Sequence, residues 1–161
     1  MEKVREAVFN VIQNRVCDKI FLDLFAGSGA VGIEALSRGA RFCIFNDRSK
    51  KNAEIIAQNI HKCNLMERSK TFAMDSLKLL AHLKACEPSK MPVDVVYIDP
   101  PYKNDCYEQI INELANGGYL SDESILIVEL PKGKPLSEKF GEFYCSKKSV
   151  YGDTEIWYFI K

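Results

Sequence analysis

The sequence predicts an α/β protein with a mostly parallel, doubly wound sheet and an antiparallel hairpin at its C-terminal edge. Two observations predict this fold. Apolar runs of strand length alternate with stretches of helical periodicity along most of the chain, which indicates a parallel sheet with helices on both faces. The last part of the chain has two strand-like runs, residues 142–152 and 154–161, joined by a Gly-Asp turn signal without a helix between them.

The elements can be assigned in order from their hydrophobic pattern. Apolar residues recur at helical spacing near the start, so residues 2–14 are predicted to form an amphipathic helix before the first strand. The predicted parallel strands have the sequences KIFLDLF, RFCIFN, KTFAM, VDVVYI and ESILIVEL. The helices predicted after the first four of these strands cover residues 30–38, 50–62, 76–84 and 107–116.

The length and composition of the chain restrict the class of protein to which it can belong. A chain of 161 residues with 47% hydrophobic and 27% charged residues is expected to form one domain, residues 1–161. It has no apolar run near the roughly 18 residues that a membrane span needs, so we expect a cytoplasmic protein without a membrane partner. The six scattered cysteines predict reduced thiols and no metal site. Because 22 basic residues balance 22 acidic ones, any nucleic-acid contact must use local patches.

A glycine-rich turn follows the first strand, in the stretch DLFAGSGAVGIEAL. Gly27, Gly29 and Gly32 form a G-x-G-x-x-G pattern, which allows a sharp turn close to a nucleotide and close packing of the following helix. The pattern alone suits either NAD or S-adenosylmethionine. Asp23 favours the latter, because its carboxylate would repel a pyrophosphate but can pair with the ammonium of a methionine moiety near a sulfonium. A structural turn and a solvated acid are the alternatives.

Acidic residues also end the second and third predicted strands. Asp47 stands where a ribose-binding acid is expected and is predicted to hold the ribose hydroxyls. Asp75 can accept a hydrogen bond from the adenine amino group, with Met74 beside the ring, although a helix N-cap is an equal alternative for Asp75. Ligands of such sheets bind beyond the carboxyl ends of the strands, so these residues are expected to share one site.

The fourth predicted strand ends in Asp99-Pro100-Pro101-Tyr102. The Pro-Pro step ends the strand and prevents a helix from starting at once, which leaves a stiff, extended corner. The Asp99 carboxylate and the Pro100 carbonyl can then accept both N–H groups of an exocyclic amine and orient its lone pair, while Tyr102 stacks on the base. The tetrapeptide therefore predicts a site for a base amine, with a chance loop corner as the alternative.

The chain resembles class I S-adenosylmethionine-dependent methyltransferases, and most closely the RsmD family of ribosomal RNA guanine-N2 methyltransferases. The similarity extends through VREAVFNVI, FLDLFAGSGAVGIEALSRGA, DVVYIDPPY and YGDTEIWYF, and D-P-P-Y is shared with DNA adenine-N6 enzymes. The resemblance implies a Rossmann-like sheet of seven strands with the last one antiparallel. It also implies a catalytic corner and a set of cofactor contacts. The corner is Asp99, Pro100, Pro101 and Tyr102, and the cofactor-binding candidates are Asp23, Phe25, Gly27, Ser28, Gly29, Asp47, Arg48, Met74 and Asp75.

Three further residues match the family pattern. Arg5 and Phe9 of the first helix are expected to face the site, with core packing as the alternative for Phe9. Glu34 is expected either to hold the glycine turn through its backbone or to contact the ligand. The family's basic N-terminal segment is expected to be absent, so RNA docking would use exposed basic residues, whose alternative role is a solvated surface. These are Arg38, Arg41, Arg48, Lys50, Lys51 and the C-terminal lysines.

The resemblance implies methyl transfer from S-adenosylmethionine to the N2 amine of a guanine in 16S ribosomal RNA. The expected partner is that RNA or the assembling 30S particle, and the protein is expected to act as a monomer. We identify no general base with a shifted pKa, and no metal is needed. The alternatives are DNA adenine-N6 methylation, for which the chain has no room for a separate target-recognition region, and a catalytically silent RNA-binding subunit. Asp23 disfavours an NAD oxidoreductase.

Overall fold

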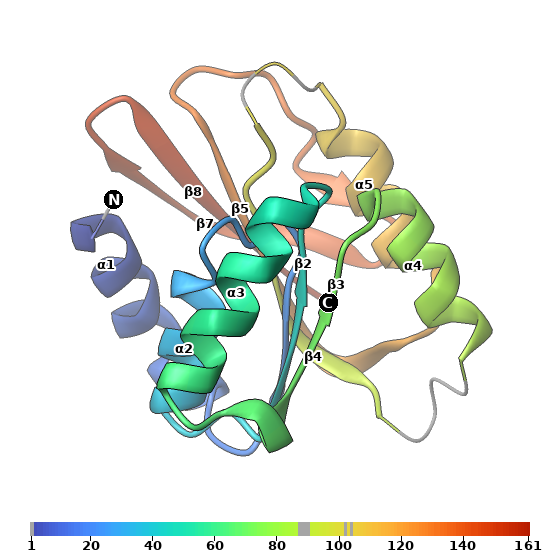
Figure 1. Cartoon of the computed structure of the whole chain (residues 1–161). Coiled ribbons are helices and arrows are strands. Elements are labelled where there is room, and N and C mark those ends of the chain that lie inside the picture. Colours follow the sequence, from blue (N-terminus) through green and yellow to red (C-terminus); the bar gives the residue numbers. More distant parts are fainter. Residues whose placement is uncertain (1, 87–90, 102, 104) are drawn as a thin grey trace.

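A single mixed sheet organises the chain (Figure 1). The computed structural model describes residues 2–86, 91–101, 103 and 105–161. The order of its eight strands is β3-β2-β1-β4-β5-β8-β7-β6. The five parallel strands are β1 (Ile20–Asp23), β2 (Phe42–Asn46), β3 (Ser69–Phe72), β4 (Val93–Ile98) and β5 (Leu120–Pro131). The antiparallel part comprises β6 (Lys139–Phe140), β7 (Phe143–Tyr151) and β8 (Thr154–Ile160).

Helices cover both faces of the sheet, as the alternating pattern predicts. Apolar residues of α1 (Glu2–Ile12), α2 (Ala30–Ser37) and α3 (Lys50–Lys62) pack in one core cluster, together with Phe21 and Phe45 of the sheet. The other face packs against α4 (Ser76–Ala85) and α5 (Tyr107–Asn116). Short 3₁₀ turns cover Gln13–Arg15 and Met66–Arg68. Within the described part of the chain, no helix has the length and apolar character needed to cross a bilayer.

The predicted fold class is confirmed, with one difference in the strand count. The sheet has eight strands and not seven, because Lys139–Phe140 pairs with the start of β7 across a turn at Gly141. A strand of two residues is too short to show an alternating pattern in the sequence. The predicted hairpin is β7–β8, and β8 also pairs with β5 in antiparallel orientation.

The order of the strands in the sheet determines where a ligand site is expected. β1 lies between β2 and β4, so the winding of the chain reverses direction there. Ligands of open α/β sheets bind at this switch point, beyond the carboxyl ends of the strands. The ends of β1, β2, β4 and β5 therefore define the region in which the candidate residues meet.

Candidate active site

Two adjoining cavities lie at the carboxyl ends of the parallel strands. The larger has a volume of about 460 Å³ and the smaller one of about 340 Å³. Four residues line both cavities, and these are Phe25, Gly27, Asp99 and Glu129. Of the other predicted site residues, the larger cavity contains Asp47, Arg48, Asp75, Pro100 and Pro101, and the smaller one contains Asp23 and Ser28. The fold thus brings together residues from the ends of five strands that are far apart in the sequence.

The glycine turn has the backbone that its sequence predicts. Gly27 and Gly29 have φ angles of +57° and +85°, which residues with a Cβ rarely adopt. Gly29 directly precedes α2. Gly32 lies so close to the sheet that a Cβ there would come within 2.3 Å of Cε1 of Phe45. The turn can therefore approach a ligand while its helix packs tightly on β2.

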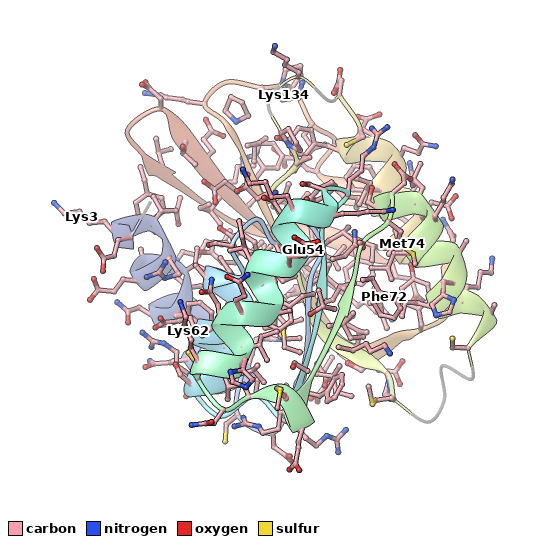
Figure 2. All side chains as sticks on the ribbon, viewed as in Figure 1. Lys3, Glu54, Lys62, Phe72, Met74 and Lys134 are labelled. Carbon is pink, nitrogen blue, oxygen red and sulfur yellow. The ribbon has the colours of Figure 1, made fainter. Side chains whose placement is uncertain are left out.

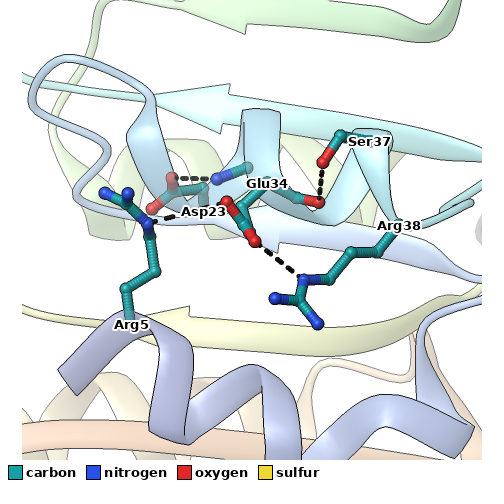
Figure 3. A network of polar contacts seen from close by, with 6 residues as sticks. Arg5, Asp23, Glu34, Ser37 and Arg38 are labelled. Carbon is teal, nitrogen blue, oxygen red and sulfur yellow. Dashed lines mark hydrogen bonds and ion pairs between the residues drawn. The ribbon is translucent and has the colours of Figure 1, made fainter. Parts of the chain in front are cut away.

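Asp23 ends β1 beneath this turn. Its Oδ2 accepts a hydrogen bond of 3.0 Å from the backbone N–H of Gly32 in the first turn of α2 (Figure 3). Only 1% of Asp23 is exposed, and it lines the smaller cavity. Burial, and secondarily the charge of Asp47, raise the pKa of Asp23 to about 7, although the Gly32 N–H opposes the shift. A cationic ligand would relieve the cost of its ionisation.

Asp47 connects the glycine turn to the end of β2. Its Oδ2 accepts from the Gly27 N–H at 2.9 Å, and its Oδ1 accepts from the Ser49 N–H at 2.9 Å and from Nδ2 of Asn52 at 3.2 Å. These bonds hold the carboxylate at the wall of the larger cavity. Asp47 therefore holds the turn in place, and its role toward ribose hydroxyls stays a prediction.

The end of β3 shows which roles its two candidate residues have in the fold. Oδ1 of Asp75 accepts from the backbone N–H groups of Leu77 and Lys78, so Asp75 is the N-cap of α4 as well as a cavity residue. Met74 (Figure 2) packs against the core cluster that includes residues of α4, and it is not among the residues that line the two cavities. Their contacts with adenine stay predictions.

The catalytic corner follows β4 directly. Asp99 is half-buried between the two cavities, and Pro100 and Pro101 line the larger one. Tyr102 lies outside the described residues. Burial, followed by the charges of Glu129 and Asp23, raises the pKa of Asp99 to about 7. The expectation that no acid–base group has a shifted pKa is therefore wrong, because Asp99 itself titrates near neutral pH.

The contacts of α1 change the interpretation of Glu34. Glu34 forms ion pairs with Arg38, at 2.8 Å, and with Arg5 of α1, at 3.8 Å (Figure 3). It therefore links α1 to α2, and within the described part of the chain its side chain pairs with these two arginines and not with the glycine turn. Arg5 lines the smaller cavity as expected. Phe9 is a core residue stacked on Phe21, which corresponds to its alternative role.

Comparison with known proteins identifies the family. The family model described as "Conserved hypothetical protein 95" matches residues 1–160. Ribosomal RNA small subunit methyltransferase D of Haemophilus influenzae is 34% identical over 138 residues, which cover 84% of this chain and 68% of that protein. The chain belongs to the RsmD family. The resemblance inferred from the sequence motifs is thereby confirmed.

Other proteins similar to this RsmD-family chain agree with the assignment. The Bacillus subtilis protein YlbH is 30% identical over 155 residues, covering 96% of this chain and 83% of that one. The solved structure of Escherichia coli yhhF has a TM-score of 0.87 at 26% identity and covers 99% of this chain and 85% of that chain. A Streptococcus pyogenes conserved hypothetical protein has a TM-score of 0.86 at 28% identity, over 98% and 94% of the two chains. The Rossmann-like methyltransferase fold is confirmed.

Sequence reasoning missed two polar residues of the RsmD-family site. Glu129 ends the apolar part of β5, is buried, and lines both cavities. Asn46 ends β2, and its Nδ2 donates to the carbonyls of Leu24 and Met74, while its buried Oδ1 has no hydrogen-bond partner among the described residues. Each residue interrupts an apolar run at the carboxyl end of a strand, and that signal could have identified both.

Proposed function

We propose that this protein transfers the methyl group of S-adenosylmethionine to the exocyclic N2 amine of a guanine in small-subunit ribosomal RNA. The observation that carries the proposal is the position of Asp99, next to the Pro-Pro corner and at the junction of two cavities. The glycine turn borders both cavities from the other side. An amine at the corner and a methyl donor along the turn would then meet beside Asp99.

The residues of the larger cavity fit the adenosine part of such a donor. Oδ1 of Asn46 is a buried acceptor to which no group in the described part of the chain donates, and Asn46 lines this cavity. Leaving a buried polar atom unpaired costs about 1–3 kcal/mol, so a ligand hydroxyl or amine that donates to it is favoured. At Gly27 a Cβ would meet no atom within 4 Å, so the turn leaves open space beside the backbone.

The charge of the site fits the sulfonium and the ammonium of the donor. Asp23, Asp99 and Glu129 line the smaller cavity, and the cation that lines it is Arg5. Burial, and then the charge of Asp47, raise the pKa of Asp23, while burial and the charges of Glu129 and Asp23 raise that of Asp99. A cation bound beside Asp23 would lower the cost of ionising this buried carboxyl group.

The chemistry of transfer requires positioning more than proton transfer. When bound, S-adenosylmethionine supplies an electrophilic methyl group for an in-line displacement. The Asp99 carboxylate and the Pro100 carbonyl accept the two N–H bonds of the amine and direct its lone pair toward that group. The Asp99 carboxylate also offsets positive charge that develops on the nitrogen. With a pKa of about 7, Asp99 can take up the proton that the product amine releases.

The protein's partners are proposed from the names of its relatives and from its surface. Ribosomal RNA, free or in the assembling 30S particle, is the proposed acceptor, and the proposed setting is the bacterial cytoplasm, with the protein as a monomer. Three exposed basic residues that follow the carboxyl end of β2 are available to phosphates near the site, namely Arg48, Lys50 and Lys51. Arg38 and Arg41 are also exposed, but Arg38 follows α2 and Arg41 precedes β2, away from the carboxyl ends of the strands. Of these, Arg38 is also paired with Glu34.

The test is transfer of labelled methyl from S-adenosylmethionine to three acceptors, namely naked 16S RNA, free 30S particles and adenine-containing duplex DNA. The modified nucleoside is then identified by mass spectrometry. We expect label in N2-methylguanosine from at least one of the RNA acceptors. Label in N6-methyladenine would move the protein to the DNA class, and binding without transfer would support a silent subunit.

A further inference from the structure

Glu129 lies beside the catalytic corner because of the register of two strands. In the parallel pair β4–β5, Ile98 is the partner of Val128, so Asp99, which follows β4 directly, comes beside Glu129 of β5. Both line both cavities, and the charge of Glu129 contributes to the raised pKa of Asp99. Only 4% of Glu129 is exposed. A second acidic group is therefore built into the place where the target amine is proposed to bind.

Tyr97 determines the hydrogen-bonding state of Glu129. The Tyr97 hydroxyl donates to Oε2 of Glu129. Burial and the charge of Glu129 raise the pKa of Tyr97 far above its usual range, so the phenol keeps its proton and can only donate here. Glu129 is consequently held as an acceptor whose orientation is set by Tyr97, which also lines the smaller cavity. A carboxylate held in this way matches a ligand N–H group and opposes a ligand lone pair.

The two acceptors side by side match one base better than the others. Guanine presents its N1–H directly beside its N2 amine, so it offers adjacent donors on one edge. Adenine presents an unprotonated N1 beside its N6 amine, and that lone pair would face the carboxylate. A base removed from its stack is read through hydrogen bonds to its Watson–Crick edge. The pair of neighbouring acceptors is therefore complementary to guanine.

Resting on the proposed function, we propose that Glu129 determines the specificity for guanine by accepting the N1–H of the base whose N2 amine Asp99 and Pro100 hold. Tyr97 is a positioning residue that acts through Glu129. Sites built to hydrogen-bond a substrate N–H reject analogues that lack it far more strongly than sites that discriminate by size alone. Removing the acceptor should therefore change the choice of base more than it changes cofactor binding.

The test compares two acceptors that differ only in the proposed contact. The wild-type reaction first locates the methylated guanine by mass spectrometry, and particles are then reconstituted with guanine or 2-aminopurine at that position. 2-Aminopurine keeps the 2-amine but lacks the N1–H. We expect the wild type to favour guanine in kcat/KM by about 10²-fold or more, as for a lost hydrogen bond to a buried charge.

The variant Glu129→Gln should remove this preference. Its amide oxygen can still accept from Tyr97, while its NH₂ faces the base and suits the N1 lone pair of 2-aminopurine. We expect the guanine to 2-aminopurine ratio to fall by about a hundredfold, with binding of S-adenosylhomocysteine by calorimetry and thermal unfolding close to the wild type. Glu123→Gln, at the exposed opposite end of β5, is the matched control and should keep the wild-type ratio.

Each outcome decides the proposal. A Glu129→Gln variant with the wild-type ratio overturns it. A variant that loses S-adenosylhomocysteine binding with an unchanged ratio also overturns it, because Glu129 would then serve the cofactor. If the wild-type protein methylates adenine, or if it methylates none of the acceptors, the proposed function itself is contradicted. The proposed role of Glu129 then loses its basis.

Discussion

Three carboxyl groups meet at the carboxyl ends of the parallel strands, namely the buried Asp23 and Glu129 and the half-buried Asp99. Burial is the main cause of the pKa values of about 7 for Asp23 and Asp99. Neighbouring acids add to the shift, Asp47 for Asp23, and Glu129 and Asp23 for Asp99, and a fold selected for stability alone would avoid this arrangement. In the ligand-free protein, ionising these acids therefore costs free energy, and a cationic ligand would lower that cost.

Asp99→Asn tests the acceptor role at the corner. We expect kcat to fall by about 10²-fold or more, because the charge that offsets the developing ammonium is lost, while binding of S-adenosylhomocysteine stays within about twofold. In the wild type, kcat/KM should rise from pH 6 to pH 8 as Asp99 of the ligand-free protein ionises around its pKa of about 7. That rise should be smaller in the variant. Pre-steady-state transfer rates across this pH range measure both effects, and a variant with wild-type kcat would contradict the mechanism.

Asp23→Asn separates binding from stability. The amide oxygen can still accept from the Gly32 N–H, but the charge is gone. We expect the affinity for S-adenosylmethionine to fall by about tenfold or more, as for loss of a charge-assisted contact. The free energy of unfolding of the ligand-free protein should rise by about 2 kcal/mol at pH 8, since a buried ionisation is removed. Calorimetry and urea unfolding measure the two quantities, and an equally stable variant would show that Asp23 is not strained.

The individual site residues were predictable where a motif marked them. Strand-end acids and turn glycines are visible in the sequence, so Asp23, Gly27, Asp47 and Asp99 could be assigned to one site. Glu129 interrupts the apolar run of β5 and could have been identified as a candidate, but its place beside Asp99 depends on the register of β4 with β5, which the sequence does not show. The pKa of Asp99 was also beyond reach, since it depends on burial and on charges from other strands.

At the scale of elements, the packing of α2 on the sheet holds the glycine turn. Gly32 lets the helix approach so closely that the ring of Phe45 and the sulfur of Cys43 occupy the space of a Cβ. The carboxylate of Asp23 accepts from the N–H of the same residue. A shift of α2 away from the sheet would therefore move the glycine turn and, at the same time, break the hydrogen bond between Gly32 and Asp23.

Gly32→Ala should demonstrate this dependence. A Cβ would lie 2.3 Å from Cε1 of Phe45 and 2.7 Å from Sγ of Cys43, so the helix or the core must move. We expect a loss of about 1–3 kcal/mol in unfolding free energy, which exceeds the gain in helix propensity, together with weaker binding of S-adenosylmethionine. Chemical unfolding and calorimetry test this expectation. Ser37→Ala, at an exposed position of the same helix, should change neither quantity by much.

Most helices and strands can be predicted from the spacing of their apolar residues, and the exceptions have physical causes. Helix α3 begins and ends where the sequence predicts, because Ser49 caps it by accepting from the Asn52 N–H. Strand β6 was not predicted because its two residues are too few to show an alternating hydrophobic pattern. Glu34 was assigned to the turn because the sequence does not show that Arg5 of α1 lies near α2.

At the scale of the whole molecule, the buried acids set the dependence of stability on pH. Asp23 and Asp99 have pKa values of about 7 in the folded protein and ordinary values near 3.8 when exposed, so the folded state binds more protons between these limits. Stability should therefore fall as pH rises from about 5 to about 7 and then level off. Urea unfolding of the ligand-free protein at pH 5, 6, 7 and 8 measures the trend. The double variant Asp23→Asn, Asp99→Asn should flatten it, and a wild type most stable at pH 8 would refute it.

The position of β8 has a consequence for how the protein is made. β8 is the last strand of the sheet in sequence, yet it lies between β5 and β7 and pairs with both. During synthesis the edge of β5 stays unpaired until residues 154–160 have left the ribosome, because the strand that covers it has not yet emerged. The nascent chain can form its parallel half and its glycine turn earlier, but the strand that carries Glu129 is paired on both sides only once β8 has emerged. Catalytic competence should thus appear only after β8 has joined the sheet.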